Sequence, residues 1–590
     1  DGNPRIVDGD SDGSAVVDIG AYEYQMQITT TTLPDAVEGV AYSFTVQAAG
    51  GNSSNYTWSV SGQPSWLSID AATGELSGTP PSGSAGTYSF TVTLTDGQQT
   101  IGKQFVLVVK LLSVNFEASS TQGTAPLTVN FTDKSRGNVT QWEWDFDNDG
   151  TPDSTQQNPT HTYSTPGWYT VKLTVTGPAG SGTCVKEKLI LVAGNIWYVD
   201  GNGGDDGNSG TGWNDAFATI GKALSVAGDY DLVLVADATY NETDLNFNGK
   251  KVYLKGVDHN TAGQQPVIDC QGSGRAFVFG SGETGDSVVD NFVIENGSAA
   301  YGGAIYCDGG SPTLTNCTLS GNKATSGNGG AISCGNSSSP TVSNCTFSGN
   351  SATSNGGAIY CDGGSPRITN CTFSGNRVTG GNGGAICCEN SSSPTVSNCA
   401  FSGNSTNFSG GAIYCDGSSP SVTNCTLCGN HSVWDGGAIY CYGSSLTITN
   451  CTFSGNSADY SGGAICCDSS TPTLNNCILW GNTASSSGNE IYTADSGSSC
   501  TLNCCCVDDT GYGGQTGNIT ENNCIFAEPQ FVDATGGDYH LKPTSPCIDA
   551  GDNTLLPSGV TTDLEGNQRI VDGDNDGTAT VDIGAYEYQP

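Results

Sequence analysis

The stretch Gly302-Gly303-Ala304-Ile305-Tyr306-Cys307 decides the fold, because it recurs along the chain. Gly-Gly-Ala-Ile begins again six times, at spacings of 27, 27, 27, 27, 26 and 26 residues: Gly329, Gly356, Gly383, Gly410, Gly436 and Gly462. Each copy leads to a cysteine, then to an Asn-Cys pair and a closing Gly-Asn pair. A self-similar period of this length is typical of stacked repeats. The sequence therefore predicts seven regular stacked units.

Each unit is predicted to consist of short strands rather than helices, because no stripe of period 3.6 runs through it. In Ile305-Tyr306-Cys307 the first and third residues share one face, and those positions do not vary between units. The run from Leu314 to Leu319 falls out of phase, which predicts a bend at Asn316, a residue type that tolerates the left-handed conformation. Asparagines stacked at such bends can hydrogen-bond from coil to coil. We expect three short strands and three turns per coil, with like residues ~4.8 Å apart.

The cysteines follow the same repeat: 14 of the 25 fall at two fixed positions of the unit. We expect them to be free thiols stacked inside the coils, since cysteine packs as a small hydrophobe. The single C-x-x-C at Cys425 and the four histidines disfavour a zinc or haem site. Disulfides are expected outside the ladders, among Cys500, Cys504, Cys505, Cys506, Cys524 and Cys547.

Residues 195–590 resemble the right-handed parallel β-helix family of secreted repeat proteins. The entry, Trp197-Tyr198-Val199-Asp200 followed by the short amphipathic run 213–224, is similar to that family's N-terminal cap. The exit, Ser545-Pro546-Cys547-Ile548-Asp549-Ala550-Gly551, is similar to the closing coils of anchored bacterial surface proteins. The resemblance implies an all-β solenoid and leaves the activity open.

Two smaller modules precede the solenoid. Residues 26–110 alternate apolar and polar residues in short runs such as Tyr42-Ser43-Phe44-Thr45-Val46, and they resemble a cadherin-related Ig-like sandwich. Residues 111–194 resemble a PKD domain through Trp144-Asp145-Phe146-Asp147 and Gly167-Trp168-Tyr169-Thr170-Val171. Both kinds of module usually serve as extracellular stalks or spacers.

The two ends of the chain are near copies of each other. Residues 1–25 agree with residues 565–589 at 20 of 25 positions, a period of 564 residues. The C-terminal copy is expected to close the β-helix, whereas the N-terminal copy has no helix to close. The chain is therefore interpreted as a segment of a tandem-repeat protein, or as a subunit that docks head-to-tail onto a copy of itself. A duplication without assembly is the alternative.

Acidic runs in both copies suggest that they bind Ca²⁺. Aspartates at alternate positions before a glycine resemble the front of a Ca²⁺ loop, in which oxygens converge on a hard cation. An EF-hand is excluded, because isoleucine stands where its bidentate glutamate belongs. A solvated acidic turn is the alternative reading of each run. The predicted ligands are Asp8, Asp10, Asp12 and Asp18, then Asp572, Asp574, Asp576 and Asp582, and in the PKD-like module Asp145, Asp147, Asp149 and Asp153.

A column of carboxylates is the one candidate for catalysis. Asp362, Glu389 and Asp416 should stack ~5 Å apart, a spacing that suits retaining glycoside hydrolysis. However, the repeat reproduces this column in most units, whereas an active site breaks a repeat. We therefore assign no catalytic or cofactor-binding residue and expect no enzyme. A polysaccharide lyase or hydrolase remains an alternative.

The amino-acid composition limits the classes of molecule that the chain can bind. Lys and Arg number 18 against 58 Asp and Glu, and the net charge of −40 disfavours nucleic acid and anionic membranes. No apolar stretch approaches the ~20 residues of a membrane span. We expect an extracellular, cell-surface structural unit of a fibre, stalk or adhesin-like assembly whose main partner is a copy of itself. A carbohydrate-binding surface protein is the second possibility.

Overall fold

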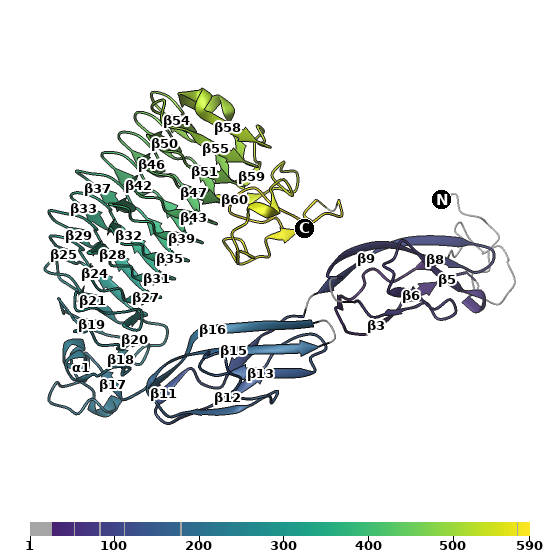
Figure 1. Cartoon of the computed structure of the whole chain (residues 1–590), viewed down its shortest axis with the longest axis horizontal. Helices are drawn as coiled ribbons and strands as arrows, with labels where there is room; N and C mark the ends of the chain where they lie inside the picture. The colour runs from purple at the N-terminus through teal and green to yellow at the C-terminus, as the bar shows by residue number, and fades with distance from the viewer. Residues whose placement is uncertain (1–25, 52, 82–83, 111, 178–179, 575) are drawn as a thin grey trace. The chain divides into compact units, whose positions relative to one another are not determined.

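The computed structural model describes residues 26–590 except 52, 82–83, 111, 178–179 and 575. It is an all-β structure in which 4% of residues are helical. The chain divides into two compact units that meet at residues 192 and 193. The first holds two β-sandwich modules and the second holds a parallel β-helix with its flanking segments (Figure 1). The fold class predicted from the sequence is confirmed.

The first module packs two main sheets and one small strand pair around Trp58, Leu76 and Phe90, all of which are buried. Its sheets have the orders β2-β9-β8-β5 and β3-β7-β6, and β1 pairs with β4. The strands are β1 (Gln27–Ile28), β2 (Ala36–Val37), β3 (Tyr42–Thr45), β4 (Ala48–Ala49), β5 (Thr57–Ser61), β6 (Leu67–Ile69), β7 (Glu75–Gly78), β8 (Gly86–Thr95) and β9 (Thr100–Lys110).

The second module packs its two sheets around Trp144, which stacks against Phe146 and meets Phe116 edge-on. The sheets have the orders β10-β12-β14 and β11-β16-β15-β13. The strands are β10 (Phe116–Ala118), β11 (Gln122–Thr124), β12 (Leu127–Asp133), β13 (Gln141–Asp145), β14 (Thr160–Tyr163), β15 (Gly167–Gly177) and β16 (Gly180–Ala193).

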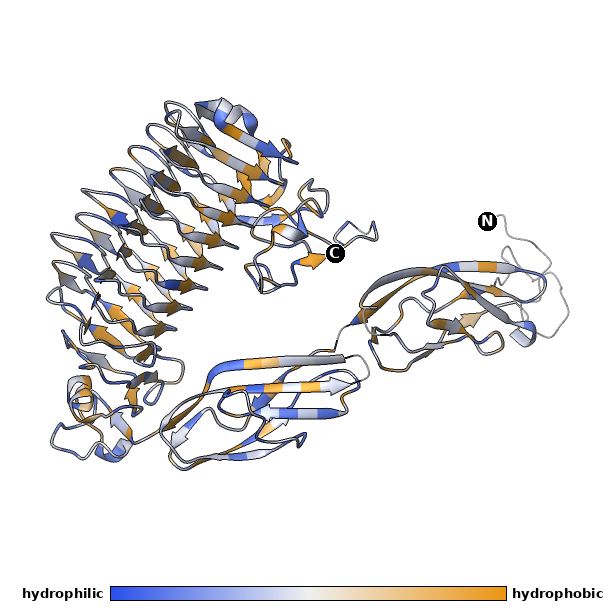
Figure 2. Ribbon diagram, viewed as in Figure 1, coloured by the Kyte–Doolittle hydropathy of each residue, from blue (hydrophilic) through white to orange (hydrophobic). Residues whose placement is uncertain are grey.

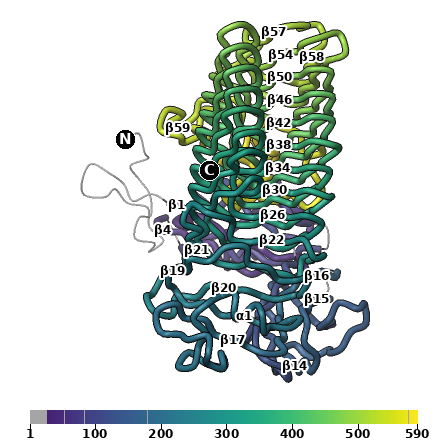
Figure 3. The backbone as a smooth tube through the Cα atoms, turned by 90° about the vertical axis from the view of Figure 1, so that its left-hand side faces the viewer, coloured from purple at the N-terminus to yellow at the C-terminus, as the bar shows by residue number. Residues whose placement is uncertain are grey.

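The β-helix consists of about ten turns, stacked one above another (Figure 3). One coil shows the arrangement: β26 (Ile305–Asp308), β27 (Thr313–Thr315), β28 (Thr318–Ser320) and β29 (Lys323–Ala324). Every strand pairs in parallel with its equivalent in the next coil, as Ile305 does with Ile332. The sheets run from β17 (Ile196–Val199) to β58 (Ile519–Asn522), from β19 (Thr239–Tyr240) to β56 (Cys506–Val507), from β22 (Phe277–Phe279) to β57 (Tyr512–Gly514), and from β25 (Ser298–Ala299) to β53 (Thr483–Ala484).

The last of these sheets corrects the prediction of three strands per coil, since each regular coil has a fourth strand of two residues. Lys323 pairs with Ser351, and Ser351 pairs with Arg377. So short a strand has no periodicity of its own, and its outward residue changes from coil to coil. The sequence pattern therefore could not predict the fourth strand.

The core is a stack of identical or similar apolar residues, as the repeat predicts. Ile305 and Cys307 point inward and are fully buried, and Leu314, Cys317 and Leu319 join them. Phenylalanines on consecutive coils lie face to face, with 4.8 Å between the ring centroids of Phe347 and Phe373. Figure 2 shows the hydrophobic segments recurring from coil to coil.

The invariant glycine pair is required by close backbone approach. Gly329 has a positive φ of 72°, a conformation that L side chains rarely adopt. A Cβ atom on Gly330 would lie 2.0 Å from the carbonyl oxygen of Gly357 in the next coil. The bend predicted at Asn316 is confirmed, because this residue has a φ of 53° and its equivalents behave alike. Some bend asparagines also bond between coils, as Asn370 does to Asn344.

A second asparagine ladder lies inside the β-helix, formed by the Gly-Asn pair that ends each unit. The side-chain nitrogen of Asn404 donates to the oxygen of Asn430 at 2.9 Å and to the carbonyl of Phe373 at 2.9 Å. Its own oxygen accepts from the backbone and the side chain of Asn376. All four hydrogen-bonding positions of this buried amide are therefore satisfied. The ladder comprises Asn322, Asn350, Asn376, Asn404, Asn430, Asn456 and Asn482.

A buried carboxylate ends this ladder. Asn482 donates its backbone and side-chain N–H groups to Glu490, which is 1% exposed. Burial raises the pKa of Glu490 to about 7, and the hydrogen bonds from Asn482 oppose that rise. This role was not predicted: Glu490 occupies the column of the repeated alanine, one residue before Ile491, which pairs with Ile465, but its coil no longer reads Gly-Gly-Ala-Ile.

The start of the β-helix is covered by α1 (Ile220–Val226), in agreement with the predicted cap. Thr219 caps the helix by accepting from the backbone of Lys222, and the carboxylate of Glu242 accepts from the first two helical N–H groups. Ile220 and Leu224 turn toward the first coils and are buried. Among the residues that the structure describes, no helix combines the length and the apolar character that a membrane crossing requires.

The C-terminal copy does not close the β-helix, and that prediction is wrong. After β58 the chain folds back along the flank of the coils, where it forms the antiparallel pairs β59 (Phe531–Asp533) with β60 (Asp538–Leu541) and β61 (Ile570–Val571) with β62 (Thr580–Val581) (Figure 1). The backbone of Gly584 donates to the carbonyl of Asn476, and that of Ala585 donates to the hydroxyl of Thr452. We call residues 545–590 the flank segment.

Candidate metal sites

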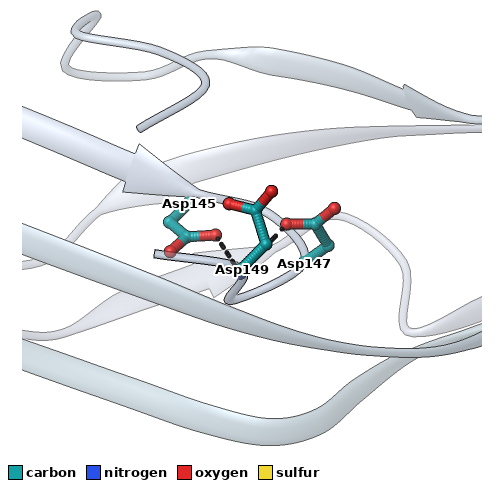
Figure 4. Close-up of side chains that lie close together, drawn as sticks. All are labelled: Asp145, Asp147 and Asp149. Carbon is teal, nitrogen blue, oxygen red and sulfur yellow. Dashed lines mark hydrogen bonds between the residues drawn. The ribbon is translucent and has the colours of Figure 1, made fainter. Parts of the chain in front are cut away.

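The PKD-like module brings three of its four predicted aspartates together. Asp145 ends β13, and Asp147 and Asp149 follow in the next turn, where Asn148 has a φ of 55° (Figure 4). One carboxylate oxygen from each of the three lies within 4.8 Å of the others. The ligands of one Ca²⁺, each at about 2.3–2.6 Å from the ion, span distances of this size.

The turn is shaped by the carboxylates themselves. The backbone N–H of Asp149 donates to Asp145 at 3.1 Å and to Asp147 at 3.2 Å, and Gly150 donates to Asp145 at 3.0 Å. Partial burial raises the pKa of Asp147, and the charges of Asp149, Asp153 and Asp145 raise it further. A bound cation would relieve this repulsion. Asp153 itself accepts from the backbone of Phe146 and is not part of the group of three.

A second group of three lies in the flank segment, and it differs from the predicted set. Asp572 and Asp574 are joined by Asp549, again with one oxygen each within 4.8 Å. Asp549 accepts from the backbone of Asp574 at 2.7 Å, and its pKa is raised by burial and by the charge of Asp574. One oxygen of Asp572 is buried without a hydrogen-bond partner, which is a feature of a carboxylate aimed at an ion.

The other predicted ligands of this run have different tasks. Asp576 is exposed and accepts from the backbone of Thr578. Asp582 is buried and accepts from the backbones of Asp549 and Tyr588, and burial raises its pKa to about 6. The predicted ligands of the N-terminal copy, which are Asp8, Asp10, Asp12 and Asp18, lie outside the described residues.

The contribution of Asp549 was missed because it stands 23 residues before Asp572 in the sequence. The two meet only because the flank segment doubles back, so that the backbone of Gly551 donates to the carbonyl of Val581. No spacing rule connects the two positions. The PKD-like group was predictable because its three residues share one turn.

The carboxylate column of the β-helix is held in coil-to-coil hydrogen bonds. Asp362 pairs in register with Glu389, as predicted. Glu389 accepts from the hydroxyl of Tyr360 at 2.7 Å and from Asn355 at 3.0 Å, and Asp362 accepts from Asn390 at 2.6 Å. These bonds assign both carboxylates a role in the stacking of the coils.

The 25 cysteines are all free thiols in the structure, so the expected ladder of thiols is confirmed and the expected disulfides are not formed. Cys505 and Cys524 extend the second column of stacked thiols. Cys506 donates to the carbonyl of Ala527 at 3.2 Å. Within the column the sulfur atoms also accept, as Cys399 does from the backbone of Cys371 at 3.4 Å.

A buried ion pair fastens the flank segment to the β-helix. Arg569 is fully buried and donates to Glu587 at 3.2 Å, to the carbonyl of Gly584 at 2.7 Å and to the side chain of Asn424 at 3.0 Å. Burial, together with the charge of Asp582, raises the pKa of Glu587 to about 9, although Arg569 opposes the rise. Ile478 and Ile583 belong to one apolar cluster beside this pair.

Comparison with known proteins agrees with this architecture. A family model for right handed beta helix regions matches residues 240–401, 303–458 and 386–542, which together cover more than half of the chain. Models of an Ig domain and a PKD domain match residues 25–110 and 112–192. A search of curated proteins finds no match.

Solved structures show distant likeness only. Pectate lyase Pel9A is similar at 14% identity over 67% of this chain and 97% of its own, with a TM-score of 0.31. Dscam1 isoform 7.44, N-terminal four Ig domains, is similar at 10% identity over 28% of this chain and 44% of its own, with a TM-score of 0.14. Endo-fucoidan hydrolase MfFcnA4 is similar at 17% identity over 28% of both chains, with a TM-score of 0.15. The chain thus spans less than half of the last two proteins.

Likeness at these values supports no statement about activity. Ig, PKD and β-helix domains together fit a surface protein, and they are typical of extracellular proteins. On the extent of the family match, the chain belongs to the right-handed β-helix family.

Proposed function

We propose that this chain is a structural unit of an extracellular surface assembly in which β-helix units follow one another head-to-tail. The observation that carries the proposal is the docked flank segment, whose last 25 residues recur as residues 1–25. The residues that fasten residues 565–589 to the coils all have counterparts there: Arg569 corresponds to Arg5, and Glu587 to Glu23.

The docking site favours a covalent array over separate subunits. The flank of this β-helix is already occupied by its own residues 565–589. A tethered segment has a high effective concentration, so a copy from another molecule would compete poorly for the same site. In a covalent array, residues 1–25 would instead be the last part of the flank segment of the preceding unit. Successive units would then be joined through the flank of a β-helix rather than through its end.

Electron microscopy of native surface material, combined with denaturing electrophoresis, tests this arrangement. We expect continuous filaments with one β-helix per period, and under reducing denaturing conditions a mass of several units. Filaments that fall apart into single units under those conditions would contradict the covalent array and retain assembly. Compact, independent single units in native material would contradict the proposal altogether.

We further propose that the two groups of three aspartates bind Ca²⁺ and stiffen the loops that carry them. Each group offers three carboxylates on backbone that is already ordered by hydrogen bonds. Backbone carbonyls and water would complete the six to eight oxygens that Ca²⁺ prefers.

Paired substitutions test each site. Asp574→Asn should weaken Ca²⁺ binding at the flank segment by about tenfold or more, because it removes a charged ligand. Asp576→Asn is the matched control and should leave the affinity nearly unchanged. In the PKD-like module, Asp149→Asn and Asp153→Asn form the corresponding pair. Calorimetric titration with Ca²⁺ measures the affinities, and equal effects within a pair would contradict the site.

A further inference from the structure

A row of aromatic side chains runs along one turn of the later regular coils. Phe408, Trp434 and Tyr460 each stand two residues before a Gly-Gly pair. The backbone of Trp434 donates to the carbonyl of Phe408 at 3.0 Å, and that of Tyr460 to the carbonyl of Trp434 at 3.1 Å, so the three are in register. The ring centroids of Phe408 and Trp434 are 4.9 Å apart. We call these three residues the aromatic row.

The aromatic row breaks the repeat. The same position in the three preceding coils carries small residues, Gly327, Ser354 and Gly381, and those coils stack in the same way. Stacking therefore does not require rings at this position. Trp434 is nevertheless 49% exposed and Tyr460 is 58% exposed, so much of their apolar surface is left in water. Exposed aromatic surface that the fold does not need is a mark of a binding site.

Polar groups neighbour the rings in the sequence. His431, in β45 (His431–Ser432), stands three residues before Trp434 and lies 3.9 Å from Asp459, the residue before Tyr460, and both side chains are partly exposed. Asp435, the residue after Trp434, uses one oxygen to accept from the backbone of Ser461 at 2.9 Å. The row therefore combines exposed aromatic faces with hydrogen-bonding groups close by in the chain.

We propose that the aromatic row binds an extended neutral polysaccharide. The C–H faces of sugar rings stack on the negative faces of aromatic rings, and sugar hydroxyls bond to carboxylates and imidazole. The coils repeat every ~4.8 Å, which is close to the advance of one sugar unit along an extended chain. Consecutive sugars can thus meet consecutive coils. The carboxylates of Asp435 and Asp459, within a chain of net charge −40, repel acidic sugars.

A protein partner fits this surface less well. A stable protein interface buries about 800 Å² on each side around an apolar centre. The three rings form a narrow strip, and residues such as Asn407, Asp435 and Asp459 interrupt the apolar surface beside it. The polysaccharide proposal also stands apart from the head-to-tail array, since the aromatic row and the flank segment share no residue.

Affinity electrophoresis of the full chain in gels that contain soluble β-glucan, xylan or mannan tests the proposal, with polygalacturonate as the acidic comparison. We expect at least one neutral glycan to retard the chain. Trp434→Ala and Tyr460→Ala should each weaken binding by about tenfold, the upper range for one aromatic stacking contact. Phe526→Ala is the control, because Phe526 is also 48% exposed but follows β58, beyond the regular coils.

Two further measurements keep the test decisive. Trp434→Phe retains a ring and should retain most of the affinity even if Trp434→Ala disturbs the turn. Binding should change little with salt, since the ligand is uncharged. The proposal is overturned if none of the three neutral glycans retards the chain, if only polygalacturonate does, or if the double variant W434A/Y460A binds as tightly as the control.

Discussion

Replacing Asn404 with alanine is expected to destabilise the β-helix by about 4 kcal/mol. The substitution deprives the carbonyl of Phe373 and two N–H groups of Asn376 of their partners, in a region where Asn404 is fully buried. Each buried polar group that is left unsatisfied costs about 1–3 kcal/mol. Denaturant unfolding measures the loss, and hydrogen exchange at the amides of the coils assigns it to the β-helix rather than to the sandwiches.

The control lies three residues further along the same coil. Asn407 is half-buried and makes one side-chain hydrogen bond, to the carbonyl of Thr379 at 2.8 Å. Asn407→Ala should cost less than about 1 kcal/mol, because water can replace that bond. Equal losses from the two substitutions would show that the buried ladder contributes no more than an ordinary surface amide.

The ladder also shows what a repeat can and cannot predict. Columns of identical residues predicted the coils, the inward Ile305 and Cys307, and the left-handed bend at Asn316, because stacking forces equivalent positions into equivalent environments. The same columns could not predict how the stack ends. Glu490 accepts the last hydrogen bonds of the ladder in the first coil that departs from Gly-Gly-Ala-Ile, where it replaces an alanine, and no other coil carries a carboxylate at that position to indicate its role.

The position of the flank segment could not be predicted from the sequence for a related reason. Its key contact joins Asn424 to Arg569 across 145 positions, and neither residue differs from its neighbours in a way that marks the pairing. Of the two candidate metal sites, one could be predicted from the sequence and the other could not. A turn brings Asp145 and Asp147 together, whereas Asp549 reaches Asp572 only through the fold of the whole segment.

Replacing Arg569 with alanine is expected to release the flank segment from the β-helix. The change leaves Glu587, the side-chain oxygen of Asn424 and the carbonyl of Gly584 without the donor that they share, and each buried polar group left unsatisfied costs about 1–3 kcal/mol. The amides of Gly584 and Ala585, which donate to Asn476 and Thr452, should then exchange with solvent much faster. Hydrogen exchange measures this release, and limited proteolysis within residues 545–590 gives a second readout.

Gln568→Ala is the matched control, since Gln568 is the exposed neighbour of Arg569 and bonds only within the segment, to the carbonyl of Ile570.

The docking of the wild-type segment should also depend on pH. Because the pKa values of Asp582 and Glu587 are raised to about 6 and about 9, the docked state binds protons that an undocked segment would lose. Their contribution to docking is therefore complete below about pH 4 and is lost as the pH rises through these two values. If R569A exchanged as slowly as Q568A, the buried pair would not be what holds the segment, and the role proposed for its copy in residues 1–25 would lose its physical basis.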